Sequence, residues 1–426
     1  MPCNSLLMNI EALLKDPVGI LGSGLSGQAV AGLLKRLGVE YNIYSEGVAD
    51  QSFNLGIAAK HQLVVYSPGF SQDHDWLKIA KTQRCVCLGE LDFASIFWKG
   101  EIIAITGTNG KTTLTTFLTA AFNGNNMPAI SAGNIGVPLS SICHVPEHDG
   151  KIAVCEVSSF QSEDLHYFKP SAVLWTNFAE DHLIRHKTIK EYFRAKWNLV
   201  HSAGTVYIGD SVRDFALKYG YDLPKKVKTV FLQENDLPSK GVLTRYPFSE
   251  NYSFAATYWK NRGASMSTME EIAQEFELPP HRLQWVDQVD GINYWNDSKA
   301  TNFLATESAL KSFEKKVIWI GGGQSKGGDI ELFANNIAPY IRIAILIGDT
   351  ACYLKKLLCD KDVECLVFWN MKSAVRYAQE HCGSGDNVLL SPGFSSFDWY
   401  VNYADRGKVY ESEVLGLKND YNPSIS

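Results

Sequence analysis

Residues 101–113 read Glu-Ile-Ile-Ala-Ile-Thr-Gly-Thr-Asn-Gly-Lys-Thr-Thr. The apolar run predicts a buried strand, the glycines predict a tight loop, and residues 113–122 favour a helix. Backbone N–H groups and the dipole at a helix N-terminus attract an anion, so Lys111 is placed to reach bound phosphates. The Thr112 hydroxyl is placed to bind Mg²⁺, as in phosphate loops generally. We expect a nucleotide-binding loop, and an ordinary strand–turn–helix is the alternative.

This loop is shorter than the full Walker motif. Its pattern is Gly107-x-x-Gly110-Lys111-Thr112, and Ile105 stands where the full motif has its first glycine. The spacing alone therefore indicates a phosphate site without naming the nucleotide.

Size and composition describe an ordinary globular protein with several domains. A chain of 426 residues exceeds what one hydrophobic core usually organises. It has 40 basic and 46 acidic residues, a net charge of −6, which argues against a sequence-independent nucleic-acid binder. No apolar run is long enough to cross a bilayer, and no signal peptide is evident. The nine scattered cysteines fit reduced thiols, so we expect a cytoplasmic protein.

A second glycine turn stands near the N-terminus, with the pattern Gly22-x-Gly24-x-x-Gly27. A strand precedes it, and a helix over 28–37 and a strand over 41–44 follow, which predicts a βαβ unit that binds a phosphate or pyrophosphate. Glu46 ends the second strand, where it either binds a ribose or is an ordinary exposed acid. The turn alone also fits a dehydrogenase that binds a nicotinamide cofactor.

Polar residues follow the next predicted strands. Glu156 ends an apolar run at 152–155, where an acid after a phosphate loop often holds Mg²⁺ and is otherwise a surface group. Asp181 and His182 follow a strand at 172–175. Lys196 lies on a predicted helix over 189–202, and its spacing alone indicates only a solvated charge.

The last third of the chain is again α/β. Apolar runs at 292–295, 317–320, 343–347 and 387–390 predict buried strands. Three of them end in polar or glycine loops, which predicts one composite site along a parallel sheet edge. We place one domain boundary before the strand predicted from residue 101 onward and a second after Pro279-Pro280. The expected domains are residues 1–98, 99–280 and 281–426.

Seven sequence blocks occur in a fixed order along the chain: Gly107-Thr-Asn-Gly-Lys111-Thr112, Glu156-Val-Ser-Ser-Phe-Gln161, Asp181-His182, Arg194-Ala-Lys196, His281-Arg282, Asn296-Asp-Ser-Lys-Ala-Thr-Asn302 and Ser391-Pro-Gly-Phe-Ser-Ser-Phe-Asp398. Taken together, they resemble the Mur ligases of bacterial cell-wall synthesis, and the similarity runs from Gly22 to Gly407. The block that begins at Ser391 and the paired Gly22–Gly27 and Ser67–Gly69 loops point to the D-glutamate-adding branch.

The resemblance implies three α/β domains, with mostly parallel sheets. The N- and C-terminal domains are Rossmann-like, and the central one is of the P-loop type. It also implies ATP as cofactor, two Mg²⁺ sites, and a CO₂-derived carbamate on Lys196 that bridges to the metal. The metal ligands implied are Thr112, Glu156, His182 and carbamylated Lys196. The implied nucleotide contacts are Gly107, Thr108, Asn109, Gly110, Lys111, Thr112, Thr113, Arg282 and Asp297.

The reaction implied is ATP-dependent addition of D-glutamate to UDP-N-acetylmuramoyl-L-alanine through an acyl phosphate, by a monomer. Lys111, Lys196 and His182 are the implied catalytic residues, with His182 a candidate base. Alternatives are a ligase for another amino acid or a folate-type substrate, and a regulatory protein without ligase activity. The implied UDP-substrate contacts are Leu25, Ser26, Gly69 and Asn134, and the implied amino-acid contacts are Thr301, Lys326, Ser396, Phe397 and Tyr403.

Overall fold

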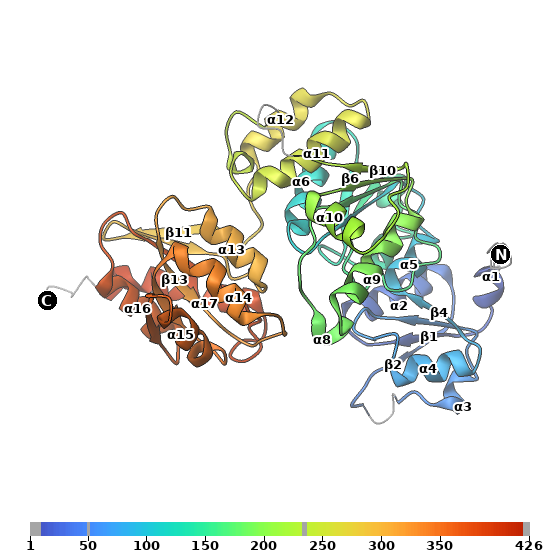
Figure 1. Ribbon diagram of the computed structural model, residues 1–426. Helices are drawn as coiled ribbons and strands as arrows, with labels where there is room; N and C mark the ends of the chain where they lie inside the picture. Colours follow the sequence, from blue (N-terminus) through green and yellow to red (C-terminus); the bar gives the residue numbers. More distant parts are fainter. Residues whose placement is uncertain (1–9, 49–51, 232–236, 421–426) are drawn as a thin grey trace, which may run out of the picture. The chain divides into compact units, whose positions relative to one another are not determined.

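A computed structural model describes residues 10–48, 52–231 and 237–420 of the chain (Figure 1). It has a multidomain α/β fold with three mostly parallel sheets, as the sequence predicts. Among the described residues, no helix is both long and apolar enough to span a membrane.

The first sheet has the strand order β2-β1-β3-β4, and all its strands are parallel. After β1 the chain turns through the predicted glycines, and α2 (Leu25–Leu37) begins three residues before the predicted helix because Gly24 is its N-cap. A Cβ on Gly27 would overlap the carbonyl oxygen of Gly22, so this turn requires glycine there. The strands are β1 (Val18–Leu21), β2 (Tyr41–Tyr44), β3 (Leu63–Tyr66) and β4 (Val86–Gly89).

The second sheet has the order β10-β9-β8-β5-β7-β6 and is also fully parallel. Every residue of β5 is buried, as its isoleucine-rich run predicts. It leads into α6 (Lys111–Gly124), which is longer than the predicted helix, and α9 (Ile189–Ser202) matches its prediction. The strands are β5 (Ile102–Thr106), β6 (Ala129–Gly133), β7 (Ile152–Glu156), β8 (Ala172–Trp175), β9 (Thr205–Ile208) and β10 (Val227–Thr229).

The edge strand β6 ends in small residues. Ser131, Ala132 and Gly133 complete it. They pair with residues 154–156 of β7, and this ladder of backbone hydrogen bonds outweighs the weak strand preference of glycine and serine.

The third sheet has the order β11-β12-β16-β13-β14-β15, with only the β11–β12 pair antiparallel. Successive residues of β13 face two different apolar cores: Trp319 packs with α13, α14 and α15, whereas Ile318 and Ile320 pack with α16 and α17. The strands are β11 (Gln284–Val289), β12 (Ile292–Asn296), β13 (Val317–Gly321), β14 (Ile341–Leu346), β15 (Glu364–Val367) and β16 (Asn387–Leu390), and the helices are α13 (Phe303–Lys311), α14 (Ile330–Ile337), α15 (Ala351–Cys359), α16 (Met371–His381) and α17 (Tyr403–Asp420).

The chain forms two compact units. The first holds the first two sheets, which both contribute residues to one apolar core, and the second holds the third sheet. The boundaries predicted after residues 98 and 280 stay predictions. The first unit comprises residues 1–178, 188–236 and 251–273, and the second comprises residues 179–187, 237–250 and 274–426.

Candidate active site

The loop between β5 and α6 has a backbone that depends on glycine. Gly107 and Gly110 have φ angles of 148° and 83°, which side-chain-bearing residues rarely adopt. A Cβ on Gly107 would overlap the hydroxyl of Thr176, and one on Gly110 would lie 2.5 Å from Oδ1 of Asn251. The helix α6 then begins at Lys111 with no side-chain cap. Such a loop at a helix N-terminus presents backbone N–H groups to an anion.

Two residues from the end of β8 hold this loop, and their role was missed in the sequence. The Asn177 side chain accepts a hydrogen bond from the Asn109 backbone N–H at 2.9 Å. The Thr176 hydroxyl donates to the Asn109 carbonyl at 2.6 Å. The only signal available was the polar pair after an apolar run, because Asn177 is 68 positions from its partner.

Two lysines converge on the carbonyl oxygens of this loop. Nζ of Lys111 donates to the carbonyls of Gly107 and Thr108, at 2.9 and 2.8 Å. Nζ of Lys196 donates to the Thr106 hydroxyl at 3.1 Å and to the Gly107 carbonyl at 3.0 Å. Lys196 is only 1% exposed, so it is not the solvated charge that its spacing indicates.

A hydroxyl, a carboxylate and an amide meet beside the same helix start. The Thr112 hydroxyl donates to Oε2 of Glu156 at 2.8 Å, and the Asn134 amide donates to Oε1 of Glu156 at 2.9 Å. Glu156 is buried at the end of β7, on the strand next to β5. Hydroxyl and carboxylate oxygens are the ligands that Mg²⁺ prefers, so this set fits the metal that the family resemblance implies.

His182 belongs to the second unit, whereas Thr112, Glu156 and Lys196 belong to the first. Its part in the metal site therefore stays a prediction. Within the part of the chain that the structure describes, no three His, Cys, Asp or Glu side chains form a metal-binding group. The predicted Mg²⁺ ligands are not a group of that type, because two of them are a threonine hydroxyl and a lysine carbamate.

The residues predicted for the UDP-substrate divide between two sheets. Ser26 and the largely exposed Leu25 follow β1, and Gly69 follows the neighbouring parallel strand β3. Ser23 and Ser45 join the loops after β1 and β2 through a 2.9 Å hydrogen bond between their hydroxyls. Asn134 instead lies in the second sheet's edge loop, bonded to Glu156. Glu46 is exposed and its Oε1 lies 3.1 Å from Nε2 of His74.

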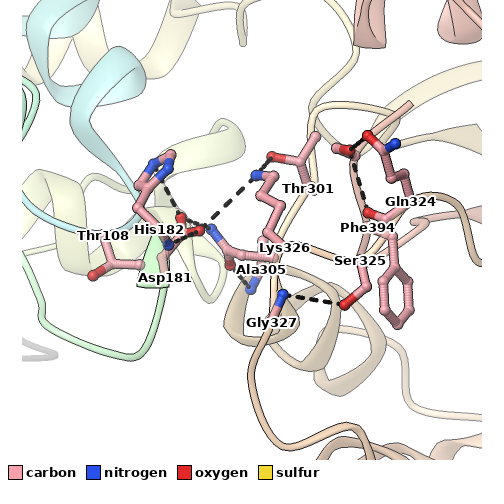
Figure 2. Close-up of polar contacts among 12 residues, drawn as sticks. Thr108, Asp181, His182, Thr301, Ala305, Gln324, Ser325, Lys326, Gly327 and Phe394 are labelled. Atoms are coloured by element: carbon pink, nitrogen blue, oxygen red, sulfur yellow. Dashed lines mark hydrogen bonds and ion pairs between the residues drawn. The ribbon is translucent and has the colours of Figure 1, made fainter. Parts of the chain in front are cut away.

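A pocket lies in the second unit and contains two of the predicted amino-acid contacts. Thr301 and Lys326 line it, and their side chains share a 3.2 Å hydrogen bond (Figure 2). Ser396 and Phe397 lie on the loop after β16, and Tyr403 begins α17. That loop is tied to the Lys326 loop by paired backbone hydrogen bonds between Gln324 and Ser395.

Asp297 occupies a buried hydrogen-bonding position in the second unit. Its carboxylate accepts from the Ser391 hydroxyl at 2.7 Å and from the Leu283 backbone N–H at 3.2 Å. Burial raises the pKa of Asp297 to about 7, against the opposing effects of these hydrogen bonds and of Arg282 and Arg406. Its predicted contact with a nucleotide stays a prediction.

Comparison with known proteins identifies the family. A model of the Mur ligase middle domain matches residues 105–261, and one of the Mur ligase glutamate ligase domain matches residues 281–394. A UDP-N-acetylmuramoylalanine–D-glutamate ligase from Thermoanaerobacter pseudethanolicus is 30% identical, over 94% of this chain and 98% of its own. This chain belongs to the Mur ligase family.

Further Mur ligases support the assignment, and the resemblance seen in the motifs is confirmed. A ligase of the same name from Caldicellulosiruptor bescii is 32% identical over 84% of each chain. The crystal structure of the UDP-N-acetylmuramate–alanine ligase MurC from Thermotoga maritima matches 95% of this chain and 99% of its own, with a TM-score of 0.59 and 15% identity. The crystal structure of MurF from the same organism, in complex with ADP, matches 84% of this chain and 96% of its own, with a TM-score of 0.57 and 13% identity. These structures share the fold.

Proposed function

We propose that this Mur ligase adds D-glutamate to UDP-N-acetylmuramoyl-L-alanine with ATP, releasing ADP and phosphate in peptidoglycan precursor synthesis. The observation that carries the chemistry is the grouping of Lys111, Thr112, Glu156 and Lys196 around one glycine loop. The choice of substrates rests on the full-length similarity to ligases of that name.

The chemical difficulty is that an amine does not attack a carboxylate. Transfer of the γ-phosphoryl group of ATP to the L-alanine carboxylate makes an acyl phosphate, which the amine of D-glutamate then attacks, releasing phosphate. Negative charge builds on the phosphoryl oxygens, so the barrier falls mainly through positive charge and N–H groups aimed at them. In this proposal, Lys111 supplies the positive charge and the first turn of α6 supplies the N–H groups.

Thr112 and Glu156 would hold Mg²⁺, and His182 is proposed as a further ligand. Bound Mg²⁺ would neutralise phosphoryl charge. We also propose that Lys196 reacts with CO₂ to give a carbamate. After losing one proton, the Lys196 amine would add to the carbon of CO₂ and lose a second proton, which leaves an anionic carbamate at a residue that is only 1% exposed. The carbamate would supply an oxygen ligand to Mg²⁺.

The remaining predicted residues are assigned to the substrates and the nucleotide. Leu25, Ser26, Gly69 and Asn134 are proposed to contact the UDP-substrate, and Arg282 and Asp297 the nucleotide. Thr301, Lys326, Ser396, Phe397 and Tyr403 are proposed to surround D-glutamate. We further propose that the enzyme acts as a cytoplasmic monomer.

Phosphate release from ATP tests the function. We expect release only when UDP-N-acetylmuramoyl-L-alanine and D-glutamate are both present. Equal or faster release with L-alanine, L-glutamate, a diamino acid or a folate-type substrate would overturn the assignment. ATP binding without turnover on any of these substrates would instead indicate a regulatory protein. Calorimetry should show binding of UDP and none of NAD.

A further inference from the structure

The pocket in the second unit carries charges of both signs. Its twelve lining residues all belong to that unit. One side holds the ammonium group of Lys326, and the other holds the carboxylate of Asp181, which the chemistry above does not use (Figure 2). Glu180 adds a second carboxylate to the lining, and His182 also lines the pocket, with its Nε2 3.5 Å from Oδ2 of Asp181.

Asp181 is held firmly in this pocket. Its Oδ2 accepts a hydrogen bond from the Asn302 amide at 3.2 Å, and its Oδ1 accepts from the backbone N–H of His182 at 2.8 Å. The Asp181 side chain is only 8% exposed. Two residues on different segments therefore fix the orientation of the Asp181 carboxylate. One is His182, the N-cap of α8 (Leu183–His186), and the other is Asn302, the N-cap of α13.

The two opposite charges face each other without a direct hydrogen bond. Nζ of Lys326 lies 3.9 Å from Oδ1 of Asp181, whereas its hydrogen bond to Thr301 measures 3.2 Å. A separation of 3.9 Å is too long for a hydrogen bond. An ammonium and a carboxylate held in this way can each bind an oppositely charged group of one ligand.

The charges define which ligands fit. A dicarboxylate without an amine would place negative charge against the Asp181 carboxylate, which is unfavourable. An α-amino acid carries an ammonium beside its carboxylate at neutral pH. Its carboxylate suits Lys326 and Thr301, and its ammonium suits Asp181, since charge-assisted hydrogen bonds are the strong ones.

We propose that Asp181 binds the ammonium group of the incoming amino acid and, paired with Lys326, makes the pocket specific for a zwitterionic head group. This inference rests on the proposed function, because it takes the pocket as the D-glutamate site. It adds a residue that recognises the amine, the group that forms the new bond.

The test compares D-glutamate with glutarate, which has both carboxylates and no amine. For wild type, Asp181→Asn and Lys326→Met, we would measure the KM for D-glutamate and the inhibition constant for glutarate in the phosphate-release assay. Asp181→Asn should raise the KM for D-glutamate roughly 10- to 100-fold, the loss expected for a charged hydrogen bond. It should leave the glutarate constant unchanged or lower, and Lys326→Met should raise both constants.

The controls separate binding from folding. Asp362→Asn changes an exposed aspartate elsewhere in the second unit, at a φ of 59° that asparagine tolerates, and it should leave both constants unchanged. The KM values for ATP and the UDP-substrate should stay within about twofold in Asp181→Asn.

Two results would overturn the proposal. One is an equal rise of the D-glutamate and glutarate constants in Asp181→Asn, because Asp181 would then only support Lys326. The other is an unchanged KM for D-glutamate. If the wild-type enzyme releases no phosphate with D-glutamate, the proposed function itself has failed, a result that the wild-type assay gives before any variant is made.

Discussion

Nζ of Lys196 lies 3.0 Å from the carbonyl oxygen of Gly107, so a buried lysine of α9 is hydrogen-bonded to the glycine loop that precedes α6. A second hydrogen bond runs from the same atom to the Thr106 hydroxyl. An unmodified amine or ammonium can donate both. A carbamate keeps a single N–H, so carbamylation requires one of these hydrogen bonds to be replaced.

The carbamate proposal predicts a dependence on CO₂. Activity should fall in buffer depleted of CO₂ and return when bicarbonate is added. Lys196→Arg keeps a positive charge but cannot form the carbamate, and it should lose roughly 100-fold or more in kcat, as removal of one charge-stabilising group does in other sites. A ¹³C signal from labelled bicarbonate should appear in the wild type alone. Full activity of Lys196→Arg would contradict the proposal.

The Thr112–Glu156 pair predicts how the enzyme responds to magnesium. Glu156→Gln removes a negative oxygen ligand while keeping a similar shape, so the Mg²⁺ concentration for half-maximal activity should rise about tenfold or more. Titration of phosphate release with Mg²⁺ measures it. Glu147→Gln, at an exposed site, is the matched control. A Glu156→Gln enzyme with the wild-type Mg²⁺ curve would exclude Glu156 as a ligand.

The backbone of the glycine loop predicts a stability difference between two alanine substitutions. Gly107→Ala should lower the free energy of unfolding by more than about 2 kcal/mol, because both its φ angle and the overlap with Thr176 oppose a Cβ. Gly263→Ala has a φ of 74° and no atom within 4 Å of its Cβ, so it should cost only about 1 kcal/mol. Urea unfolding measures both. Equal losses would mean that the overlap with Thr176 is relieved.

Asp297 predicts a pH-dependent stability difference. Because its folded pKa is about 7 and its ordinary value is 3.8, the folded state binds more protons than the unfolded state between these values. The contribution of Asp297 to stability is therefore lost progressively as pH rises from about 4 to about 7. The amide that Asp297→Asn introduces does not titrate, so the stability of this variant relative to wild type should increase across that window.

Urea unfolding of both proteins at several pH values measures this difference. Asp405→Asn, at a half-buried site near the start of α17, serves as the control. A relative stability of Asp297→Asn that is flat or falls with pH would show that the Asp297 carboxyl is not destabilised by its burial.

Local patterns predicted the parts of the fold that bind phosphate in other proteins. The β5 run and the glycines of the following loop signal their structure within about a dozen residues, so the strand, loop and helix were all found. The strand β11 was missed, since Gln284–Val289 mixes polar and apolar residues and Trp285 on it is 51% exposed. Its strand character comes from antiparallel pairing with β12, which no local pattern shows.

The residues around the candidate site were predictable only where they belong to a motif. Lys111 and Thr112 stand in the loop itself, whereas Lys196 is 89 positions from its partner Gly107 and was found only through the family resemblance. Asp181 was seen as part of a polar cluster, but its place opposite Lys326 depends on contacts with residues more than a hundred positions away. Such long-range neighbours are set by the fold rather than by spacing.

The chain passes back and forth between its two compact units, changing unit after residues 178, 187, 236, 250 and 273. No single cut in the gene therefore separates one complete unit from the other. A fragment beginning at residue 274 would lack residues 179–187, and with them the carboxylate that faces Lys326. The carboxylate on one side of the proposed amino-acid pocket is thus encoded between two segments of the unit that holds the Lys111 loop.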